Sequence, residues 1–101
     1  MQRLDNSRLI VSRFFDAIDF LIKQKHIRGV QTFTKKYGIN RWNFYTVKEQ
    51  PESGMFEVGW LENIVRDFGV SSEWLLTGNG PMIKENRANF VQRKKQTKAS
   101  I

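Results

Sequence analysis

The sequence predicts an all-α domain built from five helices. Apolar residues recur at spacings of three and four along most of the chain, as on the buried face of an amphipathic helix. No stretch alternates between apolar and polar residues for long enough to indicate a strand. Glycines follow the predicted helices, where a left-handed backbone often closes the last turn. A chain of 101 residues can bury one small core, so we expect a single domain.

The first helix is expected to run from Ser7 to about Lys25, with Asn6 or Ser7 as its N-cap. Its apolar residues fall on one stripe, and charged residues that include Arg13 fall on the opposite side. The stripe consists of Val11, Phe14, Phe15, Ile18, Leu21 and Ile22.

The second and third helices are predicted to be short and close together. The second spans Val30–Tyr37 and ends at Gly38. Asn40 is a favourable N-cap for the third helix, which continues to about Glu49. The inward-facing residues of this pair are expected to be Val30, Phe33, Tyr37, Phe44 and Val47.

A fourth helix is expected over Phe56–Phe68, followed by Gly69, and a fifth over Glu73–Leu76, capped by Ser71 or Ser72. The buried stripe of the fourth helix is predicted to hold Val58, Leu61, Ile64, Val65 and Phe68. Trp60 lies off this stripe and is expected to be partly exposed. We therefore expect a domain over residues 7–83, followed by a basic and mobile tail over residues 84–101 with Phe90 and Val91 as its main apolar residues.

The net charge of +7 is distributed unevenly along the chain. Residues 23–48 contain seven basic side chains and no acidic one, whereas residues 49–83 contain six acidic side chains and only Arg66 as a base. The tail is basic again. A block without acids predicts a polyanionic partner that meets residues 23–48, with electrostatic help from the tail.

Several classes of function are disfavoured by composition. The chain has no cysteine, and its single histidine, His26, is expected to be a surface residue. We therefore expect no metal site, no cofactor, no small-molecule substrate and no enzymatic activity. No signal peptide or long apolar run is recognisable, so a soluble, cytoplasmic protein without membrane contact is expected.

The segment from Val30 to Glu49 has the pattern of a helix-turn-helix. Two short helices flank a tight turn, and Gly38 can adopt the positive φ that such a turn needs. The second helix of this motif enters the major groove of DNA. Its outer face carries polar side chains at Asn40, Arg41, Asn43 and Thr46.

The sequence here resembles the phage-repressor and Cro family of helix-turn-helix proteins. The turn Gly38-Ile39-Asn40 is similar to that family's Gly-Val-Ser turn, and Phe44 and Val47 match apolar positions of its recognition helix. The segments from Phe68 to Gly78 and from Asn79 to Met82 resemble the end of the same fold. The resemblance implies a five-helix, lambda-repressor-like DNA-binding domain that acts as a homodimer on double-stranded DNA, with repression as a family-level expectation.

Base contacts are expected from the outer face of the third helix: Asn40, Arg41, Trp42, Asn43, Tyr45 and Thr46. Arg41 suits a guanine edge, whereas Asn40 is expected to spend its side chain mainly on the helix cap. Trp42 has two interpretations: contact with DNA, for example with thymine methyls, or packing back over the motif, which we slightly favour. Backbone contacts are expected from Arg28, Thr32, Lys35, Lys36 and Lys48.

The main alternative is a protein-interaction module, antitoxin-like or adaptor-like, on the same scaffold. Trp42 and Tyr45 stand where small polar residues are common in the family, and they favour this alternative.

Overall fold

The computed structural model describes residues 2–84, with side chains from residue 7 onward. Within this range it contains α1 (Gln2–Lys23), α2 (Val30–Tyr37), α3 (Arg41–Glu49), α4 (Val58–Phe68) and α5 (Ser72–Thr77). The prediction of an all-α domain with five helices is confirmed. The expectations for the tail, Phe90 and Val91 included, lie outside the described residues from residue 85 onward.

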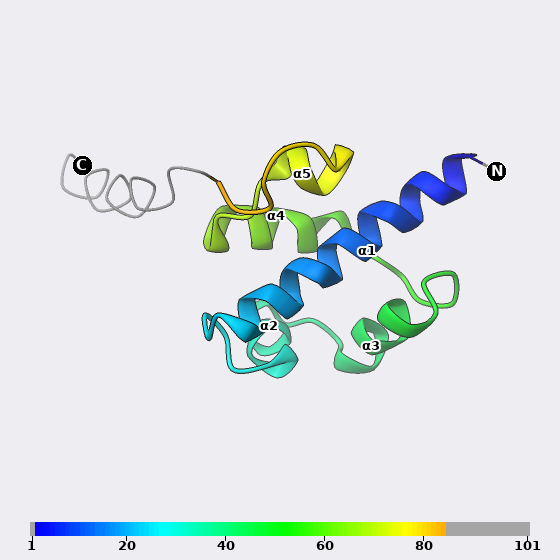
Figure 1. Ribbon diagram of the computed structural model, residues 1–101. Coiled ribbons are helices and arrows are strands. Elements are labelled where there is room, and N and C mark those ends of the chain that lie inside the picture. The colour runs from blue at the N-terminus through cyan, green and yellow to red at the C-terminus, as the bar shows by residue number, and fades with distance from the viewer. Residues whose placement is uncertain (1, 85–101) are drawn as a thin grey trace, which may run out of the picture.

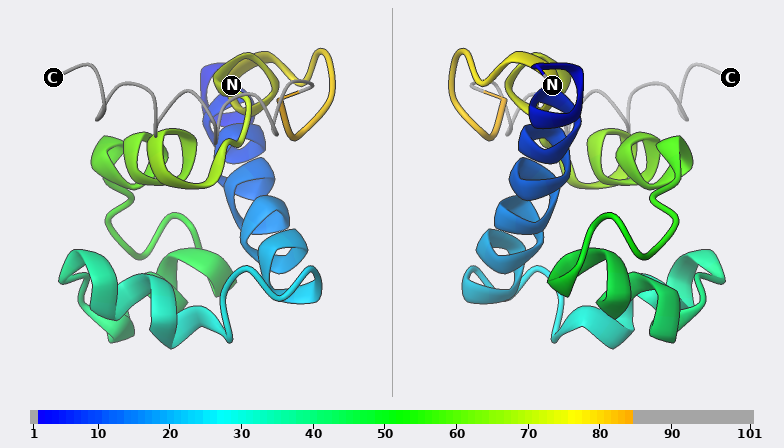
Figure 2. Two further views of the ribbon diagram at one scale, coloured as in Figure 1. Left: turned by 90° about the vertical axis from the view of Figure 1, so that its left-hand side faces the viewer. Right: turned by 90° about the vertical axis from the view of Figure 1, so that its right-hand side faces the viewer.

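The helices form two layers that α1 joins. Figure 2 shows α2 and α3 together at one end of the domain and α4 and α5 at the other, with α1 running past both pairs. Helix α1 contacts α3 and α5, and α2 contacts α3. The outer faces of α2 and α3 therefore form one end of the described domain, at the bottom of Figure 1.

Phe14 of α1 lies at the centre of the core and has no exposed surface. Its ring centroid lies 5.8 Å from that of Phe33 in α2, 6.0 Å from that of Phe44 in α3 and 6.1 Å from that of Trp60 in α4. The ring of Phe56, in the loop before α4, lies 5.5 Å away. One side chain of α1 thus holds elements from both layers through aromatic contacts.

The start of α1 differs from the prediction. The helix begins at Gln2, so Asn6 and Ser7 lie inside it instead of capping it. No glycine or proline interrupts residues 1–8, and a polar side chain that can cap does not by itself stop a helix. The other end is close to the prediction: the helix ends at Lys23, and the chain turns at Lys25, whose φ of 63° is left-handed. The N–H of His26 then donates to the carbonyl of Leu21 at 2.9 Å.

Two burial predictions on α4 are wrong. Trp60 is only 3% exposed, whereas Val58 is 77% exposed. The helix begins at Val58, with Glu57 as its N-cap, so Phe56 belongs to the preceding loop. The Trp60 ring packs between those of Phe44 and Phe56, at 5.0 and 5.1 Å, and this large aromatic surface determines which side of α4 faces the core.

Arg13 was expected on the solvent side of α1, but it joins α1 to α5. Its Nε–H donates to the carbonyl of Leu75 at 2.8 Å, and its Nη2 donates to the carbonyl of Leu76 at 3.1 Å. Carbonyls in the last turn of a helix lack helical partners, and a guanidinium satisfies two of them at once.

Gly54 lies where the loop after α3 packs against that helix. A Cβ atom at this position would lie 2.6 Å from Cγ2 of Val47 and 3.0 Å from its backbone nitrogen. Val47 is fully buried and has no space into which to move. We expect Gly54→Ala to lower the free energy of unfolding by about 1–3 kcal/mol, measured by urea denaturation.

The matched control for this substitution is Gly59→Ala. Gly59 is an exposed residue of α4, and a Cβ atom there would meet nothing within 4 Å. The control should raise the free energy of unfolding by about 0.5–1 kcal/mol, because alanine restricts the unfolded chain more than glycine does. The same loss of stability at both positions would contradict the close contact between Gly54 and Val47.

Candidate nucleic-acid interface

The turn between α2 and α3 has the local structure that the sequence predicts. Gly38 is left-handed, with φ 65° and ψ 34°, and the N–H of Ile39 donates to the carbonyl of Thr34 at 2.9 Å. Asn40 caps α3, and its Oδ1 accepts the backbone N–H of Asn43 at 2.8 Å. Phe44 and Val47 are fully buried beneath this cap. The opposite side of α3 therefore faces outward.

The outward side of α3 presents Arg41, Trp42, Tyr45 and Thr46. Arg41 is exposed, Trp42 is 75% exposed and Tyr45 is 41% exposed. The favoured interpretation of Trp42 as a residue that folds back over the core is therefore wrong. The Thr46 hydroxyl donates to the carbonyl of Trp42 at 2.8 Å, one turn earlier in the same helix.

The Asn43 side chain bonds the protein's own backbone instead of facing outward. Its Nδ2 donates to the carbonyl of Met55 at 2.9 Å, and its Oδ1 accepts the N–H of Met55, also at 2.9 Å. Both ends of the amide thus hold the loop after α3 against the helix. The expected contact between Asn43 and a base is not supported, because a base edge would have to displace these two bonds.

The predicted backbone-contacting residues other than Lys48 lie on α2, which contacts α3, and in the segment before it. Arg28, Thr32, Lys35 and Lys36 are all exposed, and Nζ of Lys36 lies 5.6 Å from the centre of the Tyr37 ring. Their exposure is compatible with contact to a polyanionic backbone, and that role stays a prediction.

Lys48 does not share the surroundings of these basic side chains. It lines a hollow between α1 and the end of α3 whose charged residues are mostly acidic: Asp16, Asp19, Glu49 and Glu52, with Arg8 as the other base. A phosphate near Lys48 would meet four carboxylates, so the expected backbone contact by Lys48 is not supported.

A hydrogen bond between Tyr37 and Asp67 joins the end of α2 to α4. The Tyr37 hydroxyl donates to Oδ2 of Asp67 at 2.5 Å, and Nε of Arg66 lies 3.2 Å from Oδ1 of the same carboxylate. Burial, and then the hydrogen bond to Asp67, raises the pKa of Tyr37, so the hydroxyl keeps its proton. Partial burial pulls the pKa of Asp67 upward, but hydrogen bonds from Tyr37 and Arg66 outweigh it and hold this pKa below its usual value.

This pair predicts a loss of stability in acid. Because the folded state lowers the pKa of Asp67, its stabilising contribution is complete above about pH 4 and is lost as the pH falls further. We expect Tyr37→Phe and Asp67→Asn each to lower the free energy of unfolding at about pH 7, and to differ much less from the wild type at about pH 2.5. Urea denaturation at both pH values measures this. A difference that stays constant between them would contradict a role for the charged carboxylate.

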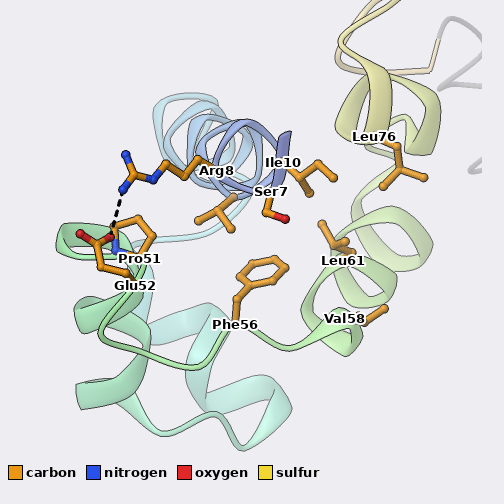
Figure 3. Close-up of a pocket in the computed structure, with 10 residues that line it drawn as sticks. Ser7, Arg8, Ile10, Pro51, Glu52, Phe56, Val58, Leu61 and Leu76 are labelled. Atoms are coloured by element: carbon orange, nitrogen blue, oxygen red, sulfur yellow. Dashed lines mark ion pairs between the residues drawn. The ribbon is translucent and has the colours of Figure 1, made fainter. Parts of the chain in front are cut away.

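A second surface feature is the groove shown in Figure 3, which lies between the N-terminal half of α1, the loop after α3, and helices α4 and α5. We call it the apolar groove. It has a volume of about 570 Å³. Its apolar lining consists of Ile10, Val11, Pro51, Phe56, Val58, Leu61 and Leu76. Arg8 and Glu52 are also part of the lining and form an ion pair, with Nη2 and Oε1 3.8 Å apart.

Other kinds of site find little support in the described part of the chain. Residues 7–84, whose side chains the structure describes, contain no group of three or more His, Cys, Asp or Glu placed to hold a metal ion. None of the helices in this range has the length and hydrophobicity that crossing a membrane requires.

Comparisons of the chain with protein-family models, with curated proteins and with solved structures give no match. The functional inference therefore depends on the residues and their arrangement.

Proposed function

We propose that this protein binds double-stranded DNA in a sequence-specific manner, as a transcriptional regulator of the repressor type. One observation carries the proposal. The exposed sides of α2 and α3, with Arg28 from the segment before α2, combine Arg28, Lys35, Lys36 and Arg41 within a block of 26 residues (23–48) that contains no acidic side chain. Such a surface attracts a polyanion and orients it toward α3 before contact.

In this proposal α2 and α3 form the helix-turn-helix, and α3 enters the major groove. Arg41 lies in the first turn of α3, where recognition helices place their base-reading side chains, and its guanidinium can bond O6 and N7 of a guanine. The basic side chains of α2 contact phosphates and set the register of α3 on the duplex. The sequence resemblance to phage repressors adds support to this arrangement.

Binding to a random-sequence duplex, measured by fluorescence anisotropy, tests the proposal. Three phosphate contacts per chain, from Arg28, Lys35 and Lys36, predict a slope of about −2.7 for log K against log salt. Affinity should therefore fall roughly 40-fold per chain between about 50 mM and about 200 mM salt. No binding at the lower salt concentration would contradict the proposal.

We further propose that the apolar groove holds a second copy of this chain, giving a symmetric dimer. Val58 and Leu76, which are 77% and 53% exposed, line the groove and would be covered. The groove also carries one charge of each sign, Arg8 and Glu52, so a two-fold axis can bring Arg8 of each copy to Glu52 of the other. The exposed sides of α2 and α3 are not part of the groove lining, so both would remain available to DNA.

Sedimentation velocity of the wild type and of Leu76→Asp tests the dimer. The wild type should sediment as a dimer, and the variant, which buries a charge in the interface, as a monomer. A wild type that stays monomeric at every concentration would contradict the dimer. In that case the groove would favour the alternative function, a protein-interaction module.

A further inference from the structure

The outer side of α3 has few free hydrogen-bonding groups. The Asn40 side-chain oxygen is used by the helix cap, the Asn43 amide by Met55, and the Thr46 hydroxyl donates to a carbonyl of its own helix. The other outward side chains in the first half of α3 are the Arg41 guanidinium and the rings of Trp42 and Tyr45, and all three are exposed. Helix α3 is therefore not well suited to recognise several bases by hydrogen bonds alone.

The two aromatic rings form one surface. Trp42 and Tyr45 are three residues apart in α3, which places them side by side on the helix. They line a shallow hollow of about 390 Å³ together with Thr46, Glu49, Gln50 and Ser53. An indole that is three-quarters exposed contributes little to the core, so its ring is available to an external partner.

The major groove offers one apolar group to such a surface. Among the four bases only thymine carries a methyl group there, at C5, and apolar side chains recognise it by contact. The same methyl group is present in 5-methylcytosine. Tyr45 lies four residues after Arg41, on the same side of α3, so a methylated pyrimidine and a guanine would be read close together.

We propose that Trp42 and Tyr45 read the C5-methyl group of a pyrimidine beside the guanine that Arg41 binds. This inference rests on the proposed DNA-binding function. Exposed tryptophan is also common at protein interfaces. The position of the rings favours DNA, because they follow Arg41 on a surface whose other charges, up to Lys48, are all basic. Glu49, the nearest acid in the hollow, lies at the opposite end of α3 from Arg41.

The test uses a duplex that the wild-type protein selects from random DNA, and the same duplex with every thymine replaced by deoxyuridine. This replacement removes only methyl groups. Wild-type affinity should fall roughly 3- to 5-fold for each methyl group contacted, the value of one buried methyl. Trp42→Ala should bind the thymine duplex more weakly and should no longer distinguish the two duplexes. Tyr45→Phe, which keeps the ring, should distinguish them as the wild type does.

A third arm separates thymine from the methyl group itself. At the position where deoxyuridine weakens binding, a C·G pair and a 5-methylcytosine·G pair are compared. Tighter binding to the methylated pair shows that the methyl group alone is recognised. Equal binding assigns the readout to thymine with its O4 atom, and overturns the wider methyl-reading claim.

The outcomes also separate this inference from the proposed function. A protein that binds no duplex overturns both. Wild-type protein that binds DNA with equal affinity for thymine and deoxyuridine duplexes overturns only the methyl readout. An unchanged affinity in Trp42→Ala would do the same, and would leave the exposed rings for a protein partner.

Discussion

Replacing Phe14 with alanine is expected to lower the free energy of unfolding by about 3–5 kcal/mol, the largest effect of any single substitution considered for this chain. The Phe14 ring is fully buried and contacts aromatic rings from α2, α3 and α4. Its removal leaves a cavity that α2 and α3 cannot close without losing their contacts with α1. A small domain has only about 5–15 kcal/mol of stability, so the variant should be close to unfolding at physiological temperature.

Urea denaturation followed by circular dichroism measures this loss. Phe20→Ala is the matched control, since Phe20 lies on the same helix and is only partly buried against the core. The control should lose about 1–2 kcal/mol, because fewer contacts are removed. Similar losses in the two variants would show that Phe14 does not have the central position described here.

The second large effect is on DNA affinity. The double substitution Lys35→Ala/Lys36→Ala should weaken binding to random-sequence DNA roughly 100-fold at about 50 mM salt, through the loss of two phosphate contacts. The slope of log K against log salt should become less steep by about 2. Both lysines are exposed at the end of α2, so the fold should be retained.

Lys48→Ala is the control for this experiment. It removes one positive charge from the same acid-free block of the sequence. Lys48, however, lies in a hollow whose other charged residues are mostly carboxylates. Its affinity and salt slope should stay close to those of the wild type. A loss of roughly 10-fold in affinity, the share of one phosphate contact, would mean that Lys48 also contacts the phosphate backbone.

Local signals in the sequence were sufficient to predict most helix ends. Helix α2 ends at Gly38 and α3 begins after Asn40, as predicted, because a left-handed glycine and an N-cap are decided by neighbouring residues. The same holds for Ser71, which caps α5 by accepting the N–H of Trp74. The start of α1 was missed, since no local feature distinguishes a capping asparagine or serine from one inside a helix.

The errors in burial and in the candidate site have a common physical cause. Arg13 bonds carbonyls 62 and 63 residues away, and Asn43 bonds a loop residue 12 positions later. The inward position of Trp60 likewise depends on rings from other elements. Contacts between elements decide all three, and helical periodicity within one element carries no information about them. The exposure of Tyr45 follows from the position of Phe44 and Val47 on α3, and could be predicted.

The most direct test of sequence-specific DNA binding through α3 is selection of bound duplexes from a random library, carried out with the wild type and with Arg41→Ala. The wild type should enrich a short motif that contains a guanine. Arg41→Ala should lose the preference at that guanine by a factor of about 5–150, the value of one bidentate contact, while keeping its preferences elsewhere. A wild-type selection that enriches no motif would contradict the account, as would an Arg41→Ala selection that recovers the same motif with the same guanine preference.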